Sequence, residues 1–228
     1  MSLFVLESLI LSIIFLVVSN WFQLFSFLRL IVGPKIKTSF VDDKWIKSIV
    51  KEKTGLSLLD ITIFQEKRMH GMMAGLPFWP KMILSEGLYK NFNKDELEWV
   101  ILHEAGHCVL WHNLEAFLIE IFILVFGIYT ILLTKMNILL IPLFSLALSF
   151  VCIQIIRWVV EYAADKYSID RVGNPKGVIT AQDKFRKNYY KNPFNDENSI
   201  FRFLLHWNIY PSKRIEMANK RLIREASK

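Results

Sequence analysis

Long runs of apolar residues alternate with more polar stretches along the chain. The first run covers residues 3–32 with charges only near its ends, and the third covers residues 136–156 with none. Each is long enough to span a bilayer as a helix, which takes about 20 residues. The second run, residues 114–134, is interrupted by Glu115 and Glu120, so its uncharged part covers only about 21 Å of helix. We interpret it as either a tilted span or a shallow re-entrant segment.

The arrangement of the runs predicts how the chain meets a membrane. The first run lacks a basic leader and a small-residue cleavage site, so we interpret residues 1–33 as an uncleaved anchor helix. A short turn at residues 135–137 separates the second and third runs, so residues 114–160 are expected to form an antiparallel helical hairpin. Residues 34–113 and 161–228 remain as two more polar parts, the second ending in a basic helical tail.

Residues 34–113 carry the signals of a small mixed domain. Asp42 is expected to cap a helix that ends at Gly55. Alternating residues at 59–63 predict a strand, and the segments at 72–74 and 81–84 predict two more. A capping-box-like start at Asn93-Lys94-Asp95-Glu96 begins a further helix. The predicted fold class is α+β, a mainly helical membrane protein with a small sheet and two or three transmembrane helices.

Composition and charge agree with a membrane protein. Hydrophobic residues make up 53% of the 228 residues, and the net charge is +7. The basic residues border the apolar runs and do not cluster with exposed aromatics, which argues against a nucleic-acid partner and favours a lipid bilayer. No Lys or Arg precedes Arg29, whereas four lysines follow the first run. The positive-inside rule therefore predicts a multi-pass protein of the cell membrane, with residues 34–113 and 158–228 on the cytoplasmic side.

The last predicted helix of the polar part carries an H-E-x-x-H motif at residues 103–107. His103 and His107 lie one helical turn apart, so both imidazoles face the same way and can share one metal ion, with Glu104 close enough to serve as a general base. A catalytic zinc site uses three protein ligands. A histidine ten residues after His103 would complete one known pattern, but that position is Asn113, and His112 is out of register for it.

Glu161 is the stronger candidate for the third ligand. It follows the third apolar run, and the predicted hairpin would return it beside the His103 helix on the same membrane face. Asp165 lies one turn further on and could accept the free N–H of a ligand histidine. The competing interpretation is that both carboxylates are solvated charges at the membrane surface. The histidine pair makes the metal site the favoured interpretation, with one zinc ion per chain as the expected cofactor.

Together these motifs resemble the membrane zinc endopeptidases of the HtpX and CAAX-prenyl-protease group. The resemblance covers roughly residues 56–170 and rests on His103–His107, the Glu161-x-x-x-Asp165 phrase and the run from Gly71 to His107. It implies a gluzincin-type catalytic domain with an active-site helix, a glutamate-bearing helix and a small sheet. It also implies an edge strand beside the active site that binds substrate through Met72, Met73, Ala74 and Gly75.

The chain departs from that family in three places. Gly71-Met72-Met73 replaces an Asn-Ala-Phe phrase, and one N-terminal span replaces two. A C-terminal His-Pro…Arg-Ile phrase is shortened here, with Tyr210 in place of the histidine. Tyr210 and His206 are therefore both candidates for the group that stabilises the oxyanion. Arg214 is a candidate supporting residue behind the metal ligands, with a purely structural role as the alternative.

The sequence therefore predicts a membrane-embedded zinc endopeptidase, with residues 34–113 and 161–228 forming its cytoplasmic catalytic parts. Its expected substrates are peptide bonds of membrane or unfolded proteins, cleaved with Glu104 as general base. A prenyl-protein endoprotease is one alternative, although that enzyme usually has more spans around its site. A zinc-binding sensor without activity is another, and the intact Glu104 argues against it. A third is a membrane-anchored structural protein in which the motif is accidental.

Overall fold

The computed structural model describes residues 38–112, 140–189 and 211–227, with some residues between 114 and 129. The chain divides into two compact units, Met1–Ile36 with Asn113–Ile156 and Lys37–His112 with Arg157–Lys228. The first apolar run and most of the second lie outside the described residues, as does the turn between the second and third runs. Within the part that is described, no helix is both long enough and apolar enough to cross a membrane.

The second unit is built on a four-stranded mixed sheet. Its strands are β1 (Thr38–Phe40), β2 (Asp60–Phe64), β3 (Gly71–Ala74) and β4 (Lys81–Ser85). They lie in the order β1-β2-β4-β3, with β2 parallel to β4 and the other pairs antiparallel. Three of these strands match the predicted segments to within a residue. The order places β3 at an edge, so among the described strands it has a neighbour on one side only.

Helix α3 (Lys44–Thr54) precedes the sheet's central strands and ends as predicted. Gly55 caps its C-terminus with a φ of 78°, a conformation that glycine adopts without steric cost. The prediction of its N-cap was wrong by one position. Asp43 makes the cap by accepting the backbone N–H groups of Trp45 and Ile46, while Asp42 pairs with Lys47 on the surface. Two adjacent aspartates have equal capping propensity, and only the path of the entering chain distinguishes them.

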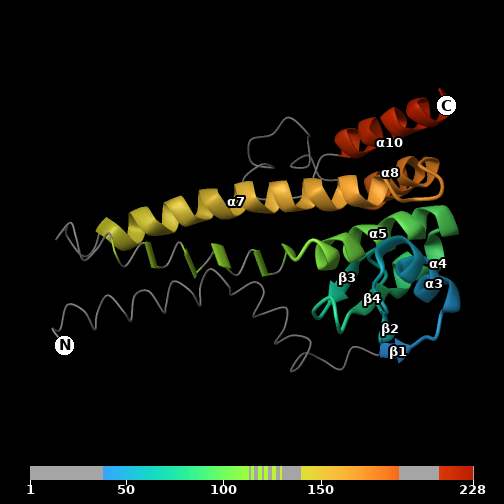
Figure 1. Cartoon of the computed structure of the whole chain (residues 1–228), viewed down its shortest axis with the longest axis horizontal. Coiled ribbons are helices and arrows are strands. Elements are labelled where there is room, and N and C mark those ends of the chain that lie inside the picture. The colour runs from blue at the N-terminus through green and yellow to red at the C-terminus, as the bar shows by residue number, and fades with distance from the viewer. Residues whose placement is uncertain are drawn as a thin grey trace. The chain divides into compact units, whose positions relative to one another are not determined.

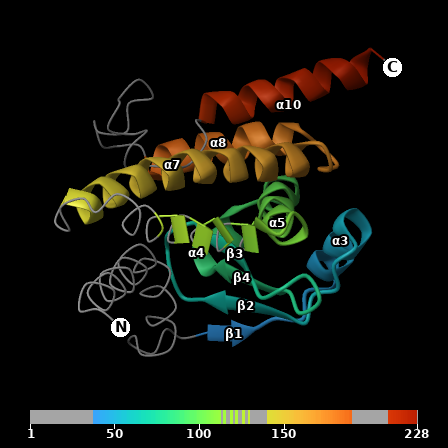
Figure 2. The same cartoon turned by 60° about the vertical axis from the view of Figure 1, so that its left-hand side comes forward.

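Helix α5 (Lys94–Val109) is the centre of the second unit. Asn93 and Glu96 form a capping box at its start, as predicted. Side chains on every face of α5 are buried, because it lies between the sheet and the helices α7 and α8 (Figures 1 and 2). A helix enclosed in this way has few alternative orientations, so the residues on its last two turns are held in fixed positions.

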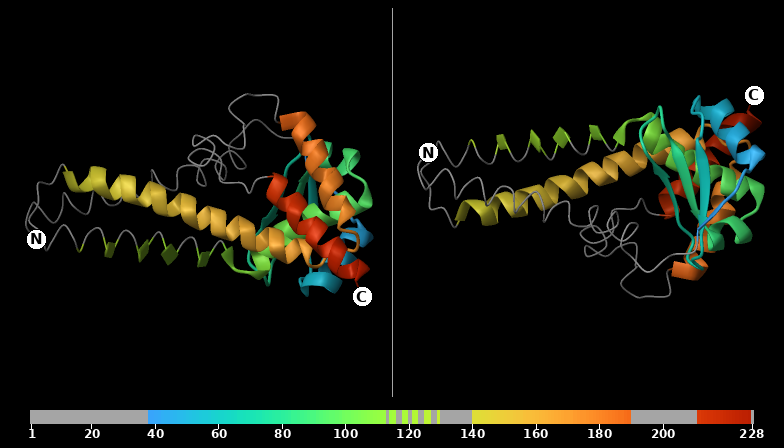
Figure 3. Two further views of the ribbon diagram at one scale, coloured as in Figure 1. Left: turned by 90° about the horizontal axis from the view of Figure 1, so that it is seen from above. Right: turned by 90° about the horizontal axis from the view of Figure 1, so that it is seen from below.

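Three further helices cover the side of α5 away from the sheet: α7 (Leu140–Ile169), α8 (Lys176–Tyr189) and α10 (Pro211–Ala226). Figure 3 shows α10 in front in the view from above and the sheet in front in the view from below. The loop between α7 and α8 is tied to the start of α5. Glu98 accepts the N–H of Gly173 at 3.0 Å and pairs with Lys53 at 2.7 Å, and Asn174 donates to Asp95. The end of α7 is thereby fixed against α5.

The short helix α4 (Glu86–Asn91) links β4 to α5. The hydroxyl of Ser85 accepts the backbone N–H of Leu88 and so caps α4, and it also accepts the N–H of His70 just before β3. Ser85 is fully buried. This one side chain therefore fixes the start of the edge strand relative to the helix that leads into α5.

Candidate metal centre

The two histidines of the H-E-x-x-H motif face each other on the last turns of α5. The Nε2 atoms of His103 and His107 are 3.2 Å apart, and their rings are nearly perpendicular. Their side chains are 10% and 17% exposed. One helical turn of spacing accounts for the shared direction, and burial of α5 against the sheet keeps the pair largely dry.

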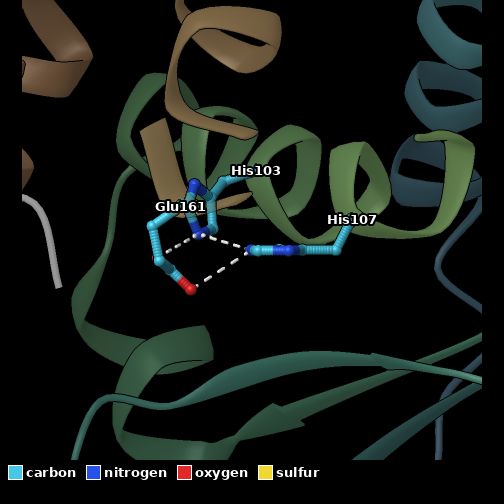
Figure 4. A group of neighbouring side chains, drawn as sticks. All are labelled: His103, His107 and Glu161. Carbon is cyan, nitrogen blue, oxygen red and sulfur yellow. Dashed lines mark hydrogen bonds and ion pairs between the residues drawn. The ribbon is translucent and has the colours of Figure 1, made fainter. Parts of the chain in front are cut away.

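Glu161 of α7 meets this pair from the opposite side. Its carboxylate oxygens lie 3.4 Å from His103 Nε2 and 3.5 Å from His107 Nε2 (Figure 4). The close approach of the two helices depends on small residues. A Cβ atom at Gly106 would lie 3.2 Å from the ring of Tyr167 and 3.6 Å from Ala164 Cα. The missing side chain at Gly106 therefore lets α7 bring Glu161 within reach of both histidines.

The donor set fits a tetrahedral zinc ion. Two imidazole nitrogens and one carboxylate oxygen all lie within 4.8 Å of one another. Ligand atoms about 2.0–2.1 Å from zinc at tetrahedral angles are roughly 3.4 Å apart. The two Nε2 atoms are 3.2 Å apart, and each lies 3.4 or 3.5 Å from a different oxygen of Glu161, so the spacing is close to this value. Three protein ligands leave the fourth position of a tetrahedron open, which is the arrangement of catalytic sites and differs from the closed structural ones.

Asp165 lies behind the ligands and joins them to helix α10. Its side chain is fully buried, with one oxygen 2.9 Å from His103 Nδ1 and the other accepting Nε of Arg214 at 2.7 Å. The Arg214 guanidinium also lies 3.6 Å from Glu161, and its central carbon lies 5.4 Å from the ring centre of Trp99. A carboxylate that accepts the Nδ1–H of His103 leaves Nε2 as the nitrogen directed at the metal position, and a metal ion that binds there would displace the Nε2 proton.

Charges within the cluster shift the pKa values of its members. Burial lowers the pKa of His103, but the Asp165 and Glu161 carboxylates outweigh burial and raise it to about 10. Burial and the charge on His103 hold the pKa of His107 near 3. Burial would raise the pKa of Glu161, yet its contact with His103 prevails and lowers it to about 2. Glu161 is therefore an anion at neutral pH, as a metal ligand must be.

Glu104, which the sequence predicts to be the general base, lies next to His103 on α5 and beside strand β3. Burial raises the pKa of its carboxyl to about 7, and the nearby Glu161 carboxylate adds to this effect against the opposing charge of His103. A Cβ atom at Gly71 would lie 3.4 Å from Glu104 Cγ and 3.2 Å from Val100 Cγ1. The glycine at the start of the edge strand thus lets the strand pass directly beside Glu104.

The free edge of β3 begins beside the cluster. The N–H of Ser85 donates to the carbonyl of His70 at 2.8 Å, and Met72 pairs with Ile83 further along. Hydrogen-bonded pairs alternate along an antiparallel ladder, so the N–H and C=O groups of Gly71 and Met73 face away from β4. The edge therefore presents backbone groups to an extended chain starting next to Glu104.

Most of the predicted site residues come together, but two lie outside the described part. His103, His107 and Glu161 form one cluster with Asp165 and Arg214, and Met72–Ala74 lie on the edge strand with Gly75 just after it, at a φ of 89°. Tyr210 and His206, the two oxyanion candidates, are not among the described residues.

Sequence reasoning missed two residues of the cluster. Trp99 precedes His103 by one turn of α5 and supports Arg214, and this spacing was a visible signal. His112 was set aside as out of register, yet it is buried with Nδ1 3.0 Å from Nδ1 of His107. No regular helix would place it there, so its spacing gave no signal.

Comparison with known proteins places the chain in a family. The model of Peptidase family M48 matches residues 43–200, more than half of the chain. Among solved structures, S. mikatae Ste24p is similar, with a TM-score of 0.62 and 14% sequence identity over 89% of this chain. The match covers 56% of the Ste24p chain, and at this identity the likeness concerns the fold. No curated protein sequence matches.

Proposed function

The chain belongs to peptidase family M48, and from this premise we propose that it is a membrane-bound, zinc-dependent endopeptidase of membrane or unfolded proteins. The resemblance to the HtpX and CAAX-prenyl-protease group is thereby confirmed, and the chain is a metallopeptidase. The observation that carries the proposal is the cluster of His103, His107 and Glu161 with Glu104 beside it. Family membership argues against an accidental motif.

Each residue of the cluster has a distinct role in the proposed hydrolysis. His103, His107 and Glu161 would hold the zinc ion, and Asp165 keeps His103 in the tautomer that can bind it. A bound zinc ion would supply Lewis acidity, which makes water a better nucleophile at neutral pH. Glu104 takes the proton from water and then delivers it to the leaving amine. A carboxyl group with a pKa near 7 suits both transfers.

An extended polypeptide is the proposed substrate, bound along the free edge of β3. The outward N–H and C=O groups of Gly71 and Met73 support this, since they could pair with a substrate strand by β-augmentation. Met72 is 42% exposed, so its side chain is available to the substrate, whereas Met73 is buried. Only a locally unfolded segment can add to a sheet edge, which favours unfolded or membrane-derived chains. Tyr210 and His206 remain the proposed oxyanion donors.

The proposed location is the cell membrane, with residues 1–33 as the anchor and residues 114–160 as the hairpin. Contact with lipid is supported by the described residues between 114 and 129, because most of their apolar side chains are exposed. The most exposed are Phe122, Tyr129, Val125, Phe126 and Leu118. Exposed apolar side chains along one helical segment are typical of a surface that meets lipid or a partner. The catalytic parts, residues 34–113 and 161–228, are proposed to lie on the cytoplasmic side.

The test is casein cleavage by the full-length chain in detergent, with Glu104→Gln as the key variant. We expect the variant to lose at least about a hundredfold in rate, because a general base contributes on that scale. Its zinc content should match the wild type, since Glu104 is not a ligand. A chelator should abolish wild-type cleavage, and added zinc should restore it. Undiminished cleavage by Glu104→Gln would overturn the proposal.

The same purified protein can distinguish the proposed function from two alternatives. A prenyl-protein endoprotease would use the same residues, so the substrate distinguishes it. Such an enzyme would cleave a prenylated C-terminal peptide and leave casein intact. A zinc sensor without activity would bind zinc and cleave neither. The intact Glu104 supports an enzyme, because a purely structural zinc site needs no general base.

A further inference from the structure

His112 lies behind His107 because the chain breaks out of helix α5. The helix ends at Val109, and Trp111 then adopts a φ of 58°. This left-handed conformation costs about 1 kcal/mol or more for a bulky side chain and is uncommon outside glycine. In a continuing helix, residue i+5 would point about 140° away from residue i. The turn at Trp111 instead folds His112 back toward His107.

The contact between the two histidines is short and buried. Nδ1 of His112 lies 3.0 Å from Nδ1 of His107, and the rings meet edge to face at 5.0 Å between centroids. His112 is 5% exposed. His107 thus has one ring nitrogen directed at His103 and Glu161 and the other at His112. Backbone strain that persists in a native fold is often found at functional sites.

We propose that His112 is a positioning residue that fixes the tautomer and ring orientation of His107. This inference rests on the proposed zinc site. If Nε2 of His107 is the metal ligand, its proton must reside on Nδ1. That N–H donates to Nδ1 of His112, which accepts as a neutral imidazole. His112 therefore does for His107 what Asp165 does for His103, so the two ligand histidines are held by different groups.

Two substitutions with the same branched shape and the same number of side-chain heavy atoms separate the acceptor from the packing. Leucine in His112→Leu fills the space without an acceptor. Asparagine in His112→Asn places its side-chain oxygen at the position of the histidine Nδ1, three bonds from Cα. A residue needed only for packing would tolerate leucine at least as well as asparagine. A residue needed as a hydrogen-bond acceptor would tolerate asparagine better than leucine.

The experiment measures zinc affinity of the full-length chain in detergent, by competition with a chromophoric chelator at fixed pH. We expect His112→Leu to bind zinc about 10- to 100-fold more weakly, as is usual when a partner of a ligand histidine is lost. His112→Asn should stay within about threefold of the wild type. Thermal unfolding of the metal-free proteins should differ little, which shows that leucine has not disrupted the fold.

The outcomes separate this inference from the function on which it rests. A wild type that binds no zinc would overturn both. A wild type that binds zinc as tightly as His112→Leu would overturn the role of His112 and leave the zinc site intact. Equal losses in the leucine and asparagine variants would also overturn it, because the acceptor would then make no difference.

Discussion

Asp165 connects the proposed metal ligand His103 to Arg214 of helix α10. It is fully buried and makes two short contacts, one with His103 and one with Arg214. A buried carboxylate is costly unless it is paired and hydrogen-bonded. Both conditions are met here, so the ligand geometry and the local stability rely on the same side chain.

Asp165→Asn should weaken zinc binding by about 10- to 100-fold, because an amide accepts the Nδ1–H of His103 less strongly than a carboxylate does. Asp170→Asn is the matched control. Asp170 lies five residues further along, 41% exposed, and pairs with Arg224 on the surface. The Asp170→Asn variant should therefore bind zinc as tightly as the wild type. Chelator competition measures both, and equal affinities for the two variants would contradict this role of Asp165.

Arg214→Ala should lower the free energy of unfolding of the metal-free protein by about 3 kcal/mol, because it leaves the buried Asp165 charge without its partner. Arg224→Ala, which removes a 61% exposed arginine from the same helix, should cost well under 1 kcal/mol. Denaturant titration in detergent compares the two. A similar decrease in the free energy of unfolding for the two variants would show that Arg214 acts as an ordinary surface charge.

Local spacing was enough to predict part of the site and insufficient for the rest. His103, His107 and Glu104 follow from one helical turn, and Asp165 follows from Glu161 by the same rule. Trp99 and His112 act through contacts that depend on how the helices pack and where one of them breaks. The left-handed turn at Trp111 has no glycine to announce it.

At the scale of elements, the site depends on how closely α5 and α7 approach. Gly106 faces Tyr167 and Ala164, with room for a small atom only if the tyrosine ring shifts. Gly106→Ala should therefore reduce zinc affinity slightly, and Gly106→Val by about tenfold or more, as the helices separate and Glu161 withdraws. The zinc affinities of the wild type and the two variants are measured by competition with a chelator. Equal affinity in all three proteins would mean that the approach is not limiting.

The edge strand β3 carries a prediction about substrate backbone. An N-methyl group can be placed on each amide of a cleavable peptide in turn. Cleavage should fall roughly fivefold at every second position near the scissile bond, where an N–H would pair with Gly71 or Met73, because a hydrogen bond contributes about 1 kcal/mol. Intervening positions should tolerate the group. Uniform tolerance at all positions would contradict binding by strand addition.

Sequence patterns predicted these elements better than their arrangement. The alternation that marks β2 and the short segments of β3 and β4 is local, so their positions were expected correctly. The pairing of β2 with β4, parallel and past an intervening β3, depends on contacts between distant residues. The edge position of β3 was implied by the family resemblance and not by its own residues.

At the scale of the whole molecule, the distribution of Lys and Arg predicts how the chain sits in a membrane. The full-length protein should stay with membranes after alkaline carbonate extraction, because residues 3–32 and 136–156 are uncharged over most of their length. A reporter that is active only in the cytoplasm should be active when fused after Lys228. Extraction by carbonate, or an inactive C-terminal reporter, would contradict the proposed placement.

The proposed metal centre also depends on joining three distant stretches of the chain. His103 and His107 come from α5, Glu161 and Asp165 from α7, and Arg214 from α10. The matched family model covers residues 43–200, which include α5 and α7 but end before Arg214. Arg214 belongs to the Arg-Ile phrase of the family resemblance, and α10 brings it to Asp165 and Glu161 from beyond the matched region.

The zinc content of the purified full-length chain, measured beside Glu161→Ala and Glu104→Gln, is the sharpest test of the three-ligand site. We expect about one zinc ion per chain in the wild type and in Glu104→Gln, and little in Glu161→Ala, since two histidines alone hold zinc weakly. Absence of stoichiometric zinc from the wild type, or full retention by Glu161→Ala, would contradict a centre built from His103, His107 and Glu161.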